Sequence, residues 1–278
     1  MAQFEYKKTD VLLKVENVSL SIGENLVLKD INFEIRDIVR PESTGIKQGQ
    51  IVGLLAPSGL GKSTLLKILA GIQKPDTGTI LIGVDQKPVV VGEVGFVQQN
   101  YPLFYNRTVF GNLNRSARIK IKDPKERKER INELLNRFDL IKVSEHYPAE
   151  LSGGQRQRAA IVQQILSSSH FLLLDEVTSG LDYNTKQKVI SVIQEVACLD
   201  ELNTIILVSH DIESTVSMAD TILIMGRDKD VNGTPLAGAL MKFEIDLIER
   251  DLAWHKEVDK TPAFVNTVNE IKSIFPTL

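Results

Sequence analysis

The strongest constraint in the sequence is one glycine-rich segment, Ala56-Pro57-Ser58-Gly59-Leu60-Gly61-Lys62-Ser63-Thr64. It follows the apolar run Gln50–Leu55, which predicts a buried strand, and it opens a predicted helix from about Lys62 to Ala70. A turn of this kind aims backbone N–H groups and a helix N-terminus at a bound phosphate. The segment therefore predicts a P-loop that binds a nucleoside triphosphate.

The positions in this loop have separate chemical reasons. Gly59 and Gly61 allow the backbone to turn inward around a β-phosphate. Lys62 is expected to reach the β- and γ-phosphates, and Ser63 is expected to offer its hydroxyl to Mg²⁺. The loop residues predicted to bind ATP are Ser58, Gly59, Gly61, Lys62, Ser63 and Thr64.

One position departs from the P-loop pattern, because Ala56 stands where glycine is usual. Alanine tolerates a positive φ poorly, so a loop that needs this conformation would carry strain of about 1 kcal/mol. A loop that needs only a small side chain there would accept alanine without strain. The sequence leaves both alternatives open.

Another apolar run, Phe171–Leu174, is followed by two carboxylates, Asp175 and Glu176. The run predicts a buried strand, and ligands bind at the carboxyl ends of parallel strands. Asp175 is therefore predicted to hold Mg²⁺, directly or through water. Glu176 is predicted to orient and polarise the attacking water.

The second half of the chain alternates predicted strands and helices, which indicates a mostly parallel sheet covered on both faces. The fold class predicted is α/β, with a P-loop NTPase core. The predicted strands are Gln50–Leu55, Phe171–Asp175, Thr204–Ser209 and Thr221–Met225, and the predicted helices between them are Tyr183–Ala197 and Glu213–Met218.

Two further regions flank this core. Val11–Leu20 and Leu26–Ile35 predict an N-terminal antiparallel β subdomain, with a turn at Gly23 between the strands and a loop from Arg36 to Lys47. Residues from about Asn100 to Ser168 predict an α-helical lobe. One of its helices starts at Asp123-Pro124, where aspartate is the N-cap and proline the first helical residue.

The segment Leu151-Ser152-Gly153-Gly154-Gln155 discriminates among nucleotide-hydrolysing proteins. Over residues 11–230 the chain resembles the ATPase subunits of ABC transporters, whose signature it matches at all five positions. The resemblance implies that Ser152, Gly153, Gly154 and Gln155 contact ATP bound by a second subunit. A helix N-terminus with glycines suits such an anion.

The same resemblance assigns further site residues. Gln99 resembles the glutamine that senses Mg²⁺ and the attacking water, with Gln98 as the competing choice. His210 resembles the switch histidine on the γ-phosphate. Asp182, in the run Ser179-Gly180-Leu181-Asp182, resembles the aspartate at the subunit seam. Ile22 stands where the family stacks adenine on an aromatic ring, and Tyr6 is the alternative for that contact.

The resemblance sets the domain boundaries and the expected partners. Residues 1–235 are expected to form the ABC ATPase domain, with its helical lobe at about 100–168. Residues 236–278 are expected to form a C-terminal helical extension. One apolar stripe consists of Leu240, Phe243, Leu247 and Ile248, and a second of Phe264, Val268, Ile271 and Phe275. The implied cofactors are ATP and Mg²⁺, and the implied partners are a second copy, an integral-membrane permease and a substrate-binding protein.

Composition argues against a nucleic-acid partner, an internal disulfide and a membrane-spanning segment. The 33 basic and 36 acidic residues give a net charge of −3, which gives no electrostatic reason to expect nucleic acid as a partner. The single cysteine, Cys198, excludes an internal disulfide, and no run approaches the roughly 20 apolar residues of a membrane span. The resemblance implies a cytoplasmic protein, peripheral on the cytoplasmic face of the inner or plasma membrane.

Alternatives remain at this stage. One is an ABC ATPase of DNA repair or translation, but long coiled-coil insertions and zinc cysteines are missing from the sequence. Another is a binding-only regulatory subunit, suggested by Ala56 and Ile22. Within transporters, the stretch Gly92–Leu113 and the tail resemble the importers of nitrate, sulfonate and taurine, although the permease selects the solute.

Overall fold

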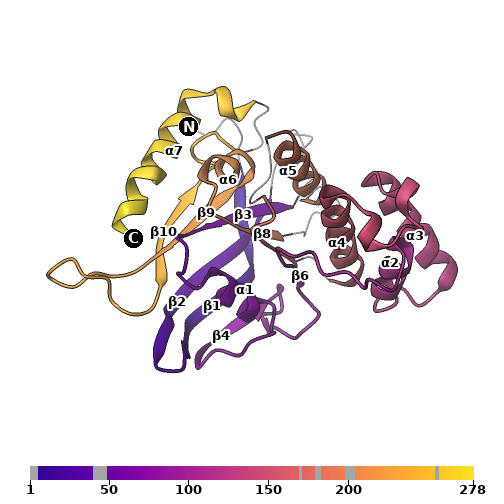
Figure 1. Ribbon diagram of the computed structural model, residues 1–278. Coiled ribbons are helices and arrows are strands. Elements are labelled where there is room, and N and C mark those ends of the chain that lie inside the picture. The colour runs from indigo at the N-terminus through magenta and orange to yellow at the C-terminus, as the bar shows by residue number, and fades with distance from the viewer. Residues whose placement is uncertain (1–5, 40–48, 169–170, 179–182, 198–203, 254–256) are drawn as a thin grey trace.

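The core of the molecule is a six-stranded sheet in the order β10-β9-β3-β8-β7-β6 (Figure 1). The computed structural model describes residues 6–39, 49–168, 171–178, 183–197, 204–253 and 257–278. Five of the strands are parallel, and β10 runs antiparallel to β9. The strands are β3 (Gln50–Leu55), β6 (Gly95–Val97), β7 (Phe171–Asp175), β8 (Thr204–Ser209), β9 (Thr221–Gly226) and β10 (Leu240–Asp246).

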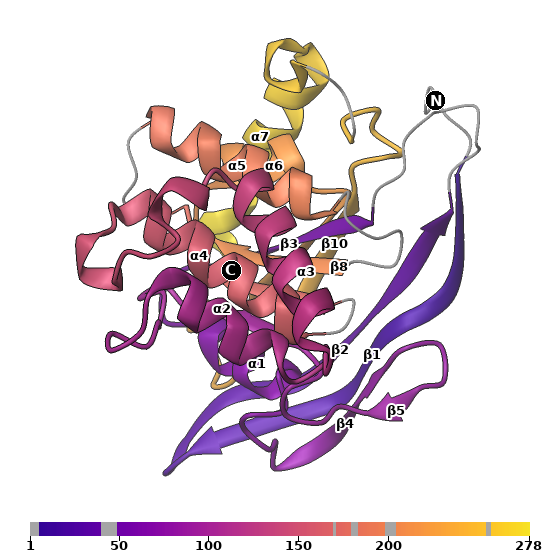
Figure 2. The same cartoon turned by 90° about the vertical axis from the view of Figure 1, so that its right-hand side faces the viewer.

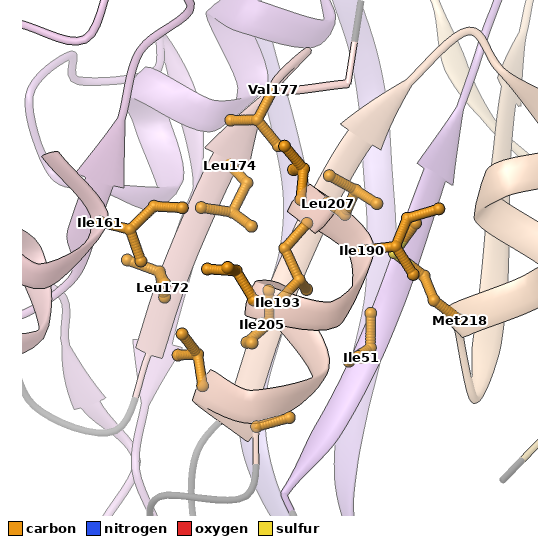
Figure 3. Packing of buried hydrophobic residues seen from close by; sticks show 14 of the residues in the cluster. Ile51, Ile161, Leu172, Leu174, Val177, Ile190, Ile193, Ile205, Leu207 and Met218 are labelled. Carbon is orange, nitrogen blue, oxygen red and sulfur yellow. The ribbon is translucent and has the colours of Figure 1, made fainter. Parts of the chain in front are cut away.

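The side chains of β3 show why this sheet is covered on both faces. Ile51 and Leu55 belong to one hydrophobic cluster, whereas Val52 and Leu54 belong to another. Successive side chains of a strand point to opposite faces, so each face of the sheet has its own core. Figure 3 shows the first cluster, in which Leu172, Leu174, Ile205 and Leu207 of β7 and β8 pack against helical residues such as Ile161 and Ile193. The predicted α/β core is confirmed.

The N-terminal subdomain is a second sheet, in the order β2-β1-β4-β5. The predicted antiparallel hairpin is confirmed, and its second strand runs to Val39, beyond the expected loop start at Arg36. The rest of that predicted loop, residues 40–47, lies outside the described residues. The strands are β1 (Lys7–Ile22), β2 (Asn25–Val39), β4 (Thr77–Ile82) and β5 (Lys87–Pro88).

The helical lobe stands to one side of both sheets, at the right of Figure 1 and towards the viewer in Figure 2. It contains α2 (Val109–Ala117), α3 (Pro124–Arg137), α4 (Gly153–Ser167) and the 3₁₀ turns η2 (Ile141–Val143) and η3 (Pro148–Glu150). The predicted start of α3 is confirmed, because Asp123 accepts hydrogen bonds from the backbone N–H groups of Lys125 and Glu126. Leu134, Leu135 and Phe138 face the lobe's core and are fully buried.

The remaining helices cover the core sheet. They are α1 (Lys62–Leu69), α5 (Tyr183–Ala197), α6 (Ile212–Met218) and α7 (Pro262–Ile274), with the 3₁₀ turns η4 (Val258–Lys260) and η5 (Phe275–Thr277). Helix α7 packs on α6, and three residues of its predicted stripe, Phe264, Val268 and Ile271, are buried as expected. The fourth, Phe275, lies in η5 after the helix and is only partly buried. Within the described parts of the chain, no helix is long and apolar enough to cross a membrane.

The prediction of a helix through Leu240, Phe243 and Leu247 is wrong, because this segment forms β10. Its backbone pairs with β9, with Ile245 opposite Ile222, and a register shift follows Met241. Apolar residues in a short window satisfy a helical and a strand period equally well, so the sequence was ambiguous there. Pairing with the otherwise open edge of β9 favours the strand. The expected extension from residue 236 is therefore not wholly helical, and its first part belongs to the core sheet.

Candidate active site

The glycine-rich loop turns tightly between β3 and α1. Gly59 has φ +81° and Gly61 has φ +80°, a conformation that side chains with a Cβ rarely adopt. A Cβ on Gly61 would also lie 2.7 Å from Cγ1 of Val27 in β2. Both glycines are thus required by the backbone, and Gly61 is the N-cap of α1, whose first turn carries Ser63 and Thr64. Ser58 is exposed at the loop.

Ala56 carries no backbone strain of the kind considered for it. It is fully buried, and it does not belong to the described non-glycine residues with positive φ. The second alternative from the sequence therefore holds, because the loop needs only a small side chain at this position. A larger side chain would have to displace the second core cluster, to which Ala56 belongs.

Lys62 points back into the loop from the start of α1. Its Nζ donates hydrogen bonds to the carbonyl oxygens of Ala56, at 2.9 Å, and Pro57, at 3.1 Å. Only 7% of the side chain is exposed, and this desolvation lowers the pKa of Lys62, against the opposing charges of Glu176 and Asp175. A buried ammonium held by neutral carbonyls can exchange them for phosphate oxygens.

Asp175 ends β7 beside the loop. Burial raises the pKa of this carboxyl, and a hydrogen bond from Ser63 opposes the rise. Its Oδ1 is buried without a hydrogen-bond partner among the residues that the structure describes. An orphaned carboxylate oxygen next to a hydroxyl fits Mg²⁺, which takes one or two carboxylates, substrate phosphates and water. The described residues contain no group of three or more acidic, histidine or cysteine ligands that could hold a metal without a nucleotide.

Glu176 brings three sequence-predicted residues together. Its Oε1 lies 4.0 Å from Nζ of Lys62 and 3.5 Å from Nδ1 of His210. Its backbone has φ +51°, and its N–H donates to the carbonyl of Val208 in β8. The carboxylate therefore stands at the common end of β3, β7 and β8, while His210 remains half exposed. An unusual backbone conformation is often found at functional positions.

Gln99 and Gln98 follow β6, which pairs with β7 through Val97 and Leu174. Both glutamines therefore leave the sheet at the same edge as the carboxylates. Gln98 lines a surface groove together with Phe104 and Gln163, and both glutamines are exposed. The choice of Gln99 over Gln98 therefore stays a prediction from the sequence.

The signature forms a capped helix start. Ser152 is the N-cap of α4: its Oγ accepts from the N–H of Gln155 at 3.3 Å, and its N–H donates to Oε1 of Gln155 at 2.9 Å. A Cβ on Gly153 would meet no atom within 4 Å, and one on Gly154 only the end of Arg158. The cavity of about 470 Å³ beside the signature is lined by Tyr101, α4 and α5, with no residue of the phosphate loop.

The remaining predicted site residues lie elsewhere. Ile22 ends β1 and is 54% exposed, as an adenine contact would require. The alternative of Tyr6 is wrong, because Tyr6 precedes β1 and its hydroxyl donates to Asp246 at 2.9 Å. A 16-residue strand, about 50 Å long, separates it from Ile22. Asp182 and the run 179–182 lie outside the described residues.

Sequence reasoning missed three contacts around this site. The carbonyl of Val177 accepts hydrogen bonds from Tyr101 and from Gln157 of α4. Lys186 of α5 pairs with Asp211, the residue after His210. Asp211 followed by a short helix predicts an N-cap, but no pattern in the sequence predicts which side chain reaches a distant carbonyl.

Comparisons with known proteins agree with this geometry. The family model "ABC transporter" matches residues 39–179, about half of the chain. The chain is 37% identical over 219 residues to "Sulfate/thiosulfate import ATP-binding protein CysA" of Synechocystis sp., with 77% of this chain and 58% of that protein covered. It is 38% identical over 218 residues to "Probable sulfate/thiosulfate import ATP-binding protein CysA" of Chlorella vulgaris, with 77% and 87% covered.

Among solved structures, the fold matches the dimeric structure of MJ0796, a bacterial ABC transporter cassette. The TM-score is 0.66 at 27% identity, with 85% of this chain and 99% of that chain covered. A second structure of the same cassette is a post-hydrolysis state bound to ADP and Pi. The chain spans less than two thirds of the length of the Synechocystis relative. The matched family model, together with these relatives, places the chain in the ABC transporter family of ATP-binding proteins.

Proposed function

We propose that this chain hydrolyses ATP as the motor subunit of an ABC transporter. The observation that carries the proposal is that Lys62 and His210 both lie within 4.0 Å of the Glu176 carboxylate, at the ends of three parallel strands. A buried cation, a carboxylate and an imidazole at one strand edge supply charge stabilisation and water activation for phosphoryl transfer.

Each residue has a step in this mechanism. The loop N–H groups and Lys62 bind the β- and γ-phosphates, and Ser63, Asp175 and Gln99 would hold Mg²⁺. That ion, when bound, neutralises the charge that develops on the phosphate oxygens. Glu176 accepts a hydrogen bond from the attacking water and polarises it, and His210 donates to the γ-phosphate. The exposed Ile22 packs against the adenine.

The second subunit completes the site. The signature is capped, its residues Ser152 and Gly153 are exposed, and the cavity beside it has no lining residue from the phosphate loop, which makes it available to a nucleotide on another chain. A two-fold, head-to-tail pair of copies would form two such sites from one kind of interface. Ser152, Gly153, Gly154, Gln155 and Asp182 would then face the partner's ATP. The dimer described for the MJ0796 cassette supports this arrangement.

The transport partner would dock on the helical lobe. Phe104 and Tyr105 are 43% and 64% exposed, and Arg115 lies 5.0 Å from the centre of the Phe104 ring. Beside Phe104 lies a groove that Ile72, Val91 and Pro102 also line. We assign this surface to an integral-membrane permease, on the cytoplasmic face of the inner or plasma membrane. Tyr101, by contrast, is half-buried and is not part of this surface.

The solute class follows only from the relatives. Both curated relatives carry import names for sulfate and thiosulfate, which supports import of a small solute over the DNA-repair and translation alternatives. Co-purification of the full chain from membranes, with mass spectrometry of the accompanying subunits, would identify the permease and any substrate-binding protein. Recovery of a nucleic-acid processing complex instead would contradict a role in transport.

The test of hydrolysis is direct. The purified full chain with ATP and Mg²⁺ should release phosphate, and Lys62→Ala should lose nucleotide binding and turnover together. The exposed Lys260→Ala is the matched control and should behave as the wild type. Tight ATP binding by a wild-type chain that never releases phosphate would instead establish the binding-only alternative.

A further inference from the structure

Three segments of the chain meet on one backbone carbonyl, that of Val177. The hydroxyl of Tyr101 donates to it at 3.2 Å, and Nε2 of Gln157 donates to it at 2.8 Å. Tyr101 follows the predicted Mg²⁺-sensing Gln99, and Gln157 lies in α4, five residues after its N-cap Ser152. A carbonyl oxygen has two lone pairs, so these two donors satisfy it completely.

Burial makes this meeting point rigid. Val177 and Gln157 are 0% and 1% exposed, and Tyr101 is half-buried against the same core. Val177 lies just beyond the end of β7, in the packed cluster that includes Leu174 and Leu207 (Figure 3). Burial also raises the pKa of the Tyr101 phenol, which therefore stays protonated and remains a donor. Hydrogen bonds that are shielded from water hold their geometry more firmly than exposed ones.

The carbonyl lies next to the predicted base. Val177 directly follows Glu176, whose backbone has φ +51°, and Tyr101 has φ +47°. Residues other than glycine adopt such angles only where surrounding contacts enforce them. The N–H of Glu176 is fixed by the carbonyl of Val208 at 3.0 Å on one side. The two donors on Val177 fix the chain on the other side.

We propose that Tyr101 and Gln157 are positioning residues for ATP hydrolysis, which hold the Glu176 carboxylate in register through the carbonyl of Val177. They tie the loop after β6 and the signature helix to the water-activating residue. A displacement of α4, which carries the signature, would therefore move Glu176 as well. This inference rests on the proposed ATPase activity.

The test compares Tyr101→Phe and Gln157→Met with the wild-type full chain. Each substitution removes one donor and keeps most of the side-chain volume. We expect kcat to fall about threefold to tenfold, the size of one lost hydrogen bond, while KM for ATP stays within twofold. Tyr147→Phe, the same chemical change on an exposed side chain of the lobe, is the control and should leave both constants unchanged.

A double-mutant cycle separates positioning from a general structural role. In single-turnover measurements on a Glu176→Gln background, neither substitution should lower the residual rate further, because no base remains to be positioned. An equal fall in both backgrounds would overturn the inference, and so would an unchanged kcat for Tyr101→Phe in the wild-type background. Thermal unfolding identifies a variant that fails to fold. If Gln157→Met does so, Tyr101→Phe alone decides.

The outcomes for the two proposals are distinct. A wild-type chain that does not hydrolyse ATP with Mg²⁺ would refute the proposed function itself. A wild-type chain that hydrolyses ATP, with a Tyr101→Phe variant that matches it in kcat and KM, would refute only the role of the Val177 carbonyl.

Discussion

The phosphate-loop end of the core contains polar groups and backbone angles that lower stability, whereas the signature end of the helical lobe begins with a satisfied N-cap. In the core, a buried lysine, an orphaned carboxylate oxygen and a positive φ at Glu176 all lower stability locally. In the lobe, Ser152 and Gln155 satisfy each other in a capping box, and a Cβ on Gly153 would meet open space. The core site is thus strained in a way that a bound ligand would relieve, whereas the signature is a capped helix end, as expected for a surface that we propose to contact the ATP of a second copy.

The comparison depends first on Glu176 as the base of the core site. Glu176→Gln should lower kcat by about 10²-fold to 10⁴-fold, because the amide cannot accept a proton from water. ATP binding should persist, since Lys62 and the loop remain. Single-turnover phosphate release and equilibrium nucleotide binding measure the two effects. The exposed Glu257→Gln is the matched control, and normal turnover of Glu176→Gln would remove this residue from the chemistry.

A defect in the phosphate loop of one chain and a defect in the signature of another should complement each other in a mixed dimer. Lys62→Ala disables the core site and Ser152→Arg blocks the signature, so each variant alone should lose at least about 100-fold in rate. An equal mixture should recover up to about one quarter of the wild-type rate, because half of the dimers are mixed and each mixed dimer holds one intact site. Phosphate release as a function of mixing ratio measures this recovery.

Two outcomes of the mixing experiment are informative. A rate that peaks near equal amounts supports a site shared between chains. A mixture that dimerises but shows no recovery at any ratio would mean that the signature serves its own chain, and the contrast between the two regions would then be wrong. Sedimentation of the mixture with nucleotide provides the dimerisation control, because Lys62→Ala alone is expected to bind no nucleotide.

Replacing a glycine by alanine should change the free energy of unfolding differently in the two regions. Gly61→Ala should cost about 1–3 kcal/mol of unfolding free energy, because φ is +80° and the new Cβ would lie 2.7 Å from Val27. Gly153→Ala meets no neighbour and should stay within about 0.5 kcal/mol of the wild type. Urea unfolding of the nucleotide-free chain measures both, and similar costs for the two variants would show that the signature glycine also serves the fold.

Much of the core could be predicted from the sequence, because its signals are local. The apolar runs that became β3, β7 and β8 have no competing helical period, and glycine, proline and N-cap residues fix the starts of α1, α3 and α7. Lys62 belongs to the loop after β3, Glu176 follows β7 and His210 follows β8, so one topological rule brings the three residues together.

The failures share a physical cause, which is contact between distant segments. Leu240–Asp246 became a strand because the edge of β9 was open to it, and no nearby residue carries that information. Tyr6 was the alternative for the adenine contact, but a hydrogen bond to Asp246, 240 residues away, holds it at the end of β1 opposite to Ile22. The two donors on Val177 come from the loop after β6 and from α4, and only the packed core decides that they meet.

The smallest expected effect concerns the stability that the folded chain loses by burying the Asp175 carboxylate in the core site. Burial raises the pKa of Asp175, so the folded state disfavours its ionised form, and wild-type stability falls as pH rises above the unfolded value of about 3.9. Asp175→Asn should therefore raise the melting temperature of the nucleotide-free chain at pH 7, although it removes an Mg²⁺ ligand. The gain should shrink towards pH 4, where the wild-type carboxyl takes up its proton.

Asp246 is the matched control for Asp175, since it is also a half-buried carboxyl. Burial acts to raise its pKa as well, but hydrogen bonds from Lys8, the backbone of Glu249 and Tyr6 outweigh burial and leave the pKa lowered. Asp246→Asn should thus lower the melting temperature at pH 7, with a loss that fades as pH falls through the lowered pKa. Opposite changes in melting temperature for the two variants would show that the Asp175 carboxylate, which has no ion pair within the described parts of the chain, lowers stability. The Asp246 carboxylate, which has an ion pair with Lys8, would then raise it. Equal signs would mean that Asp175 is an ordinary structural residue and that the core site is no more strained than the signature.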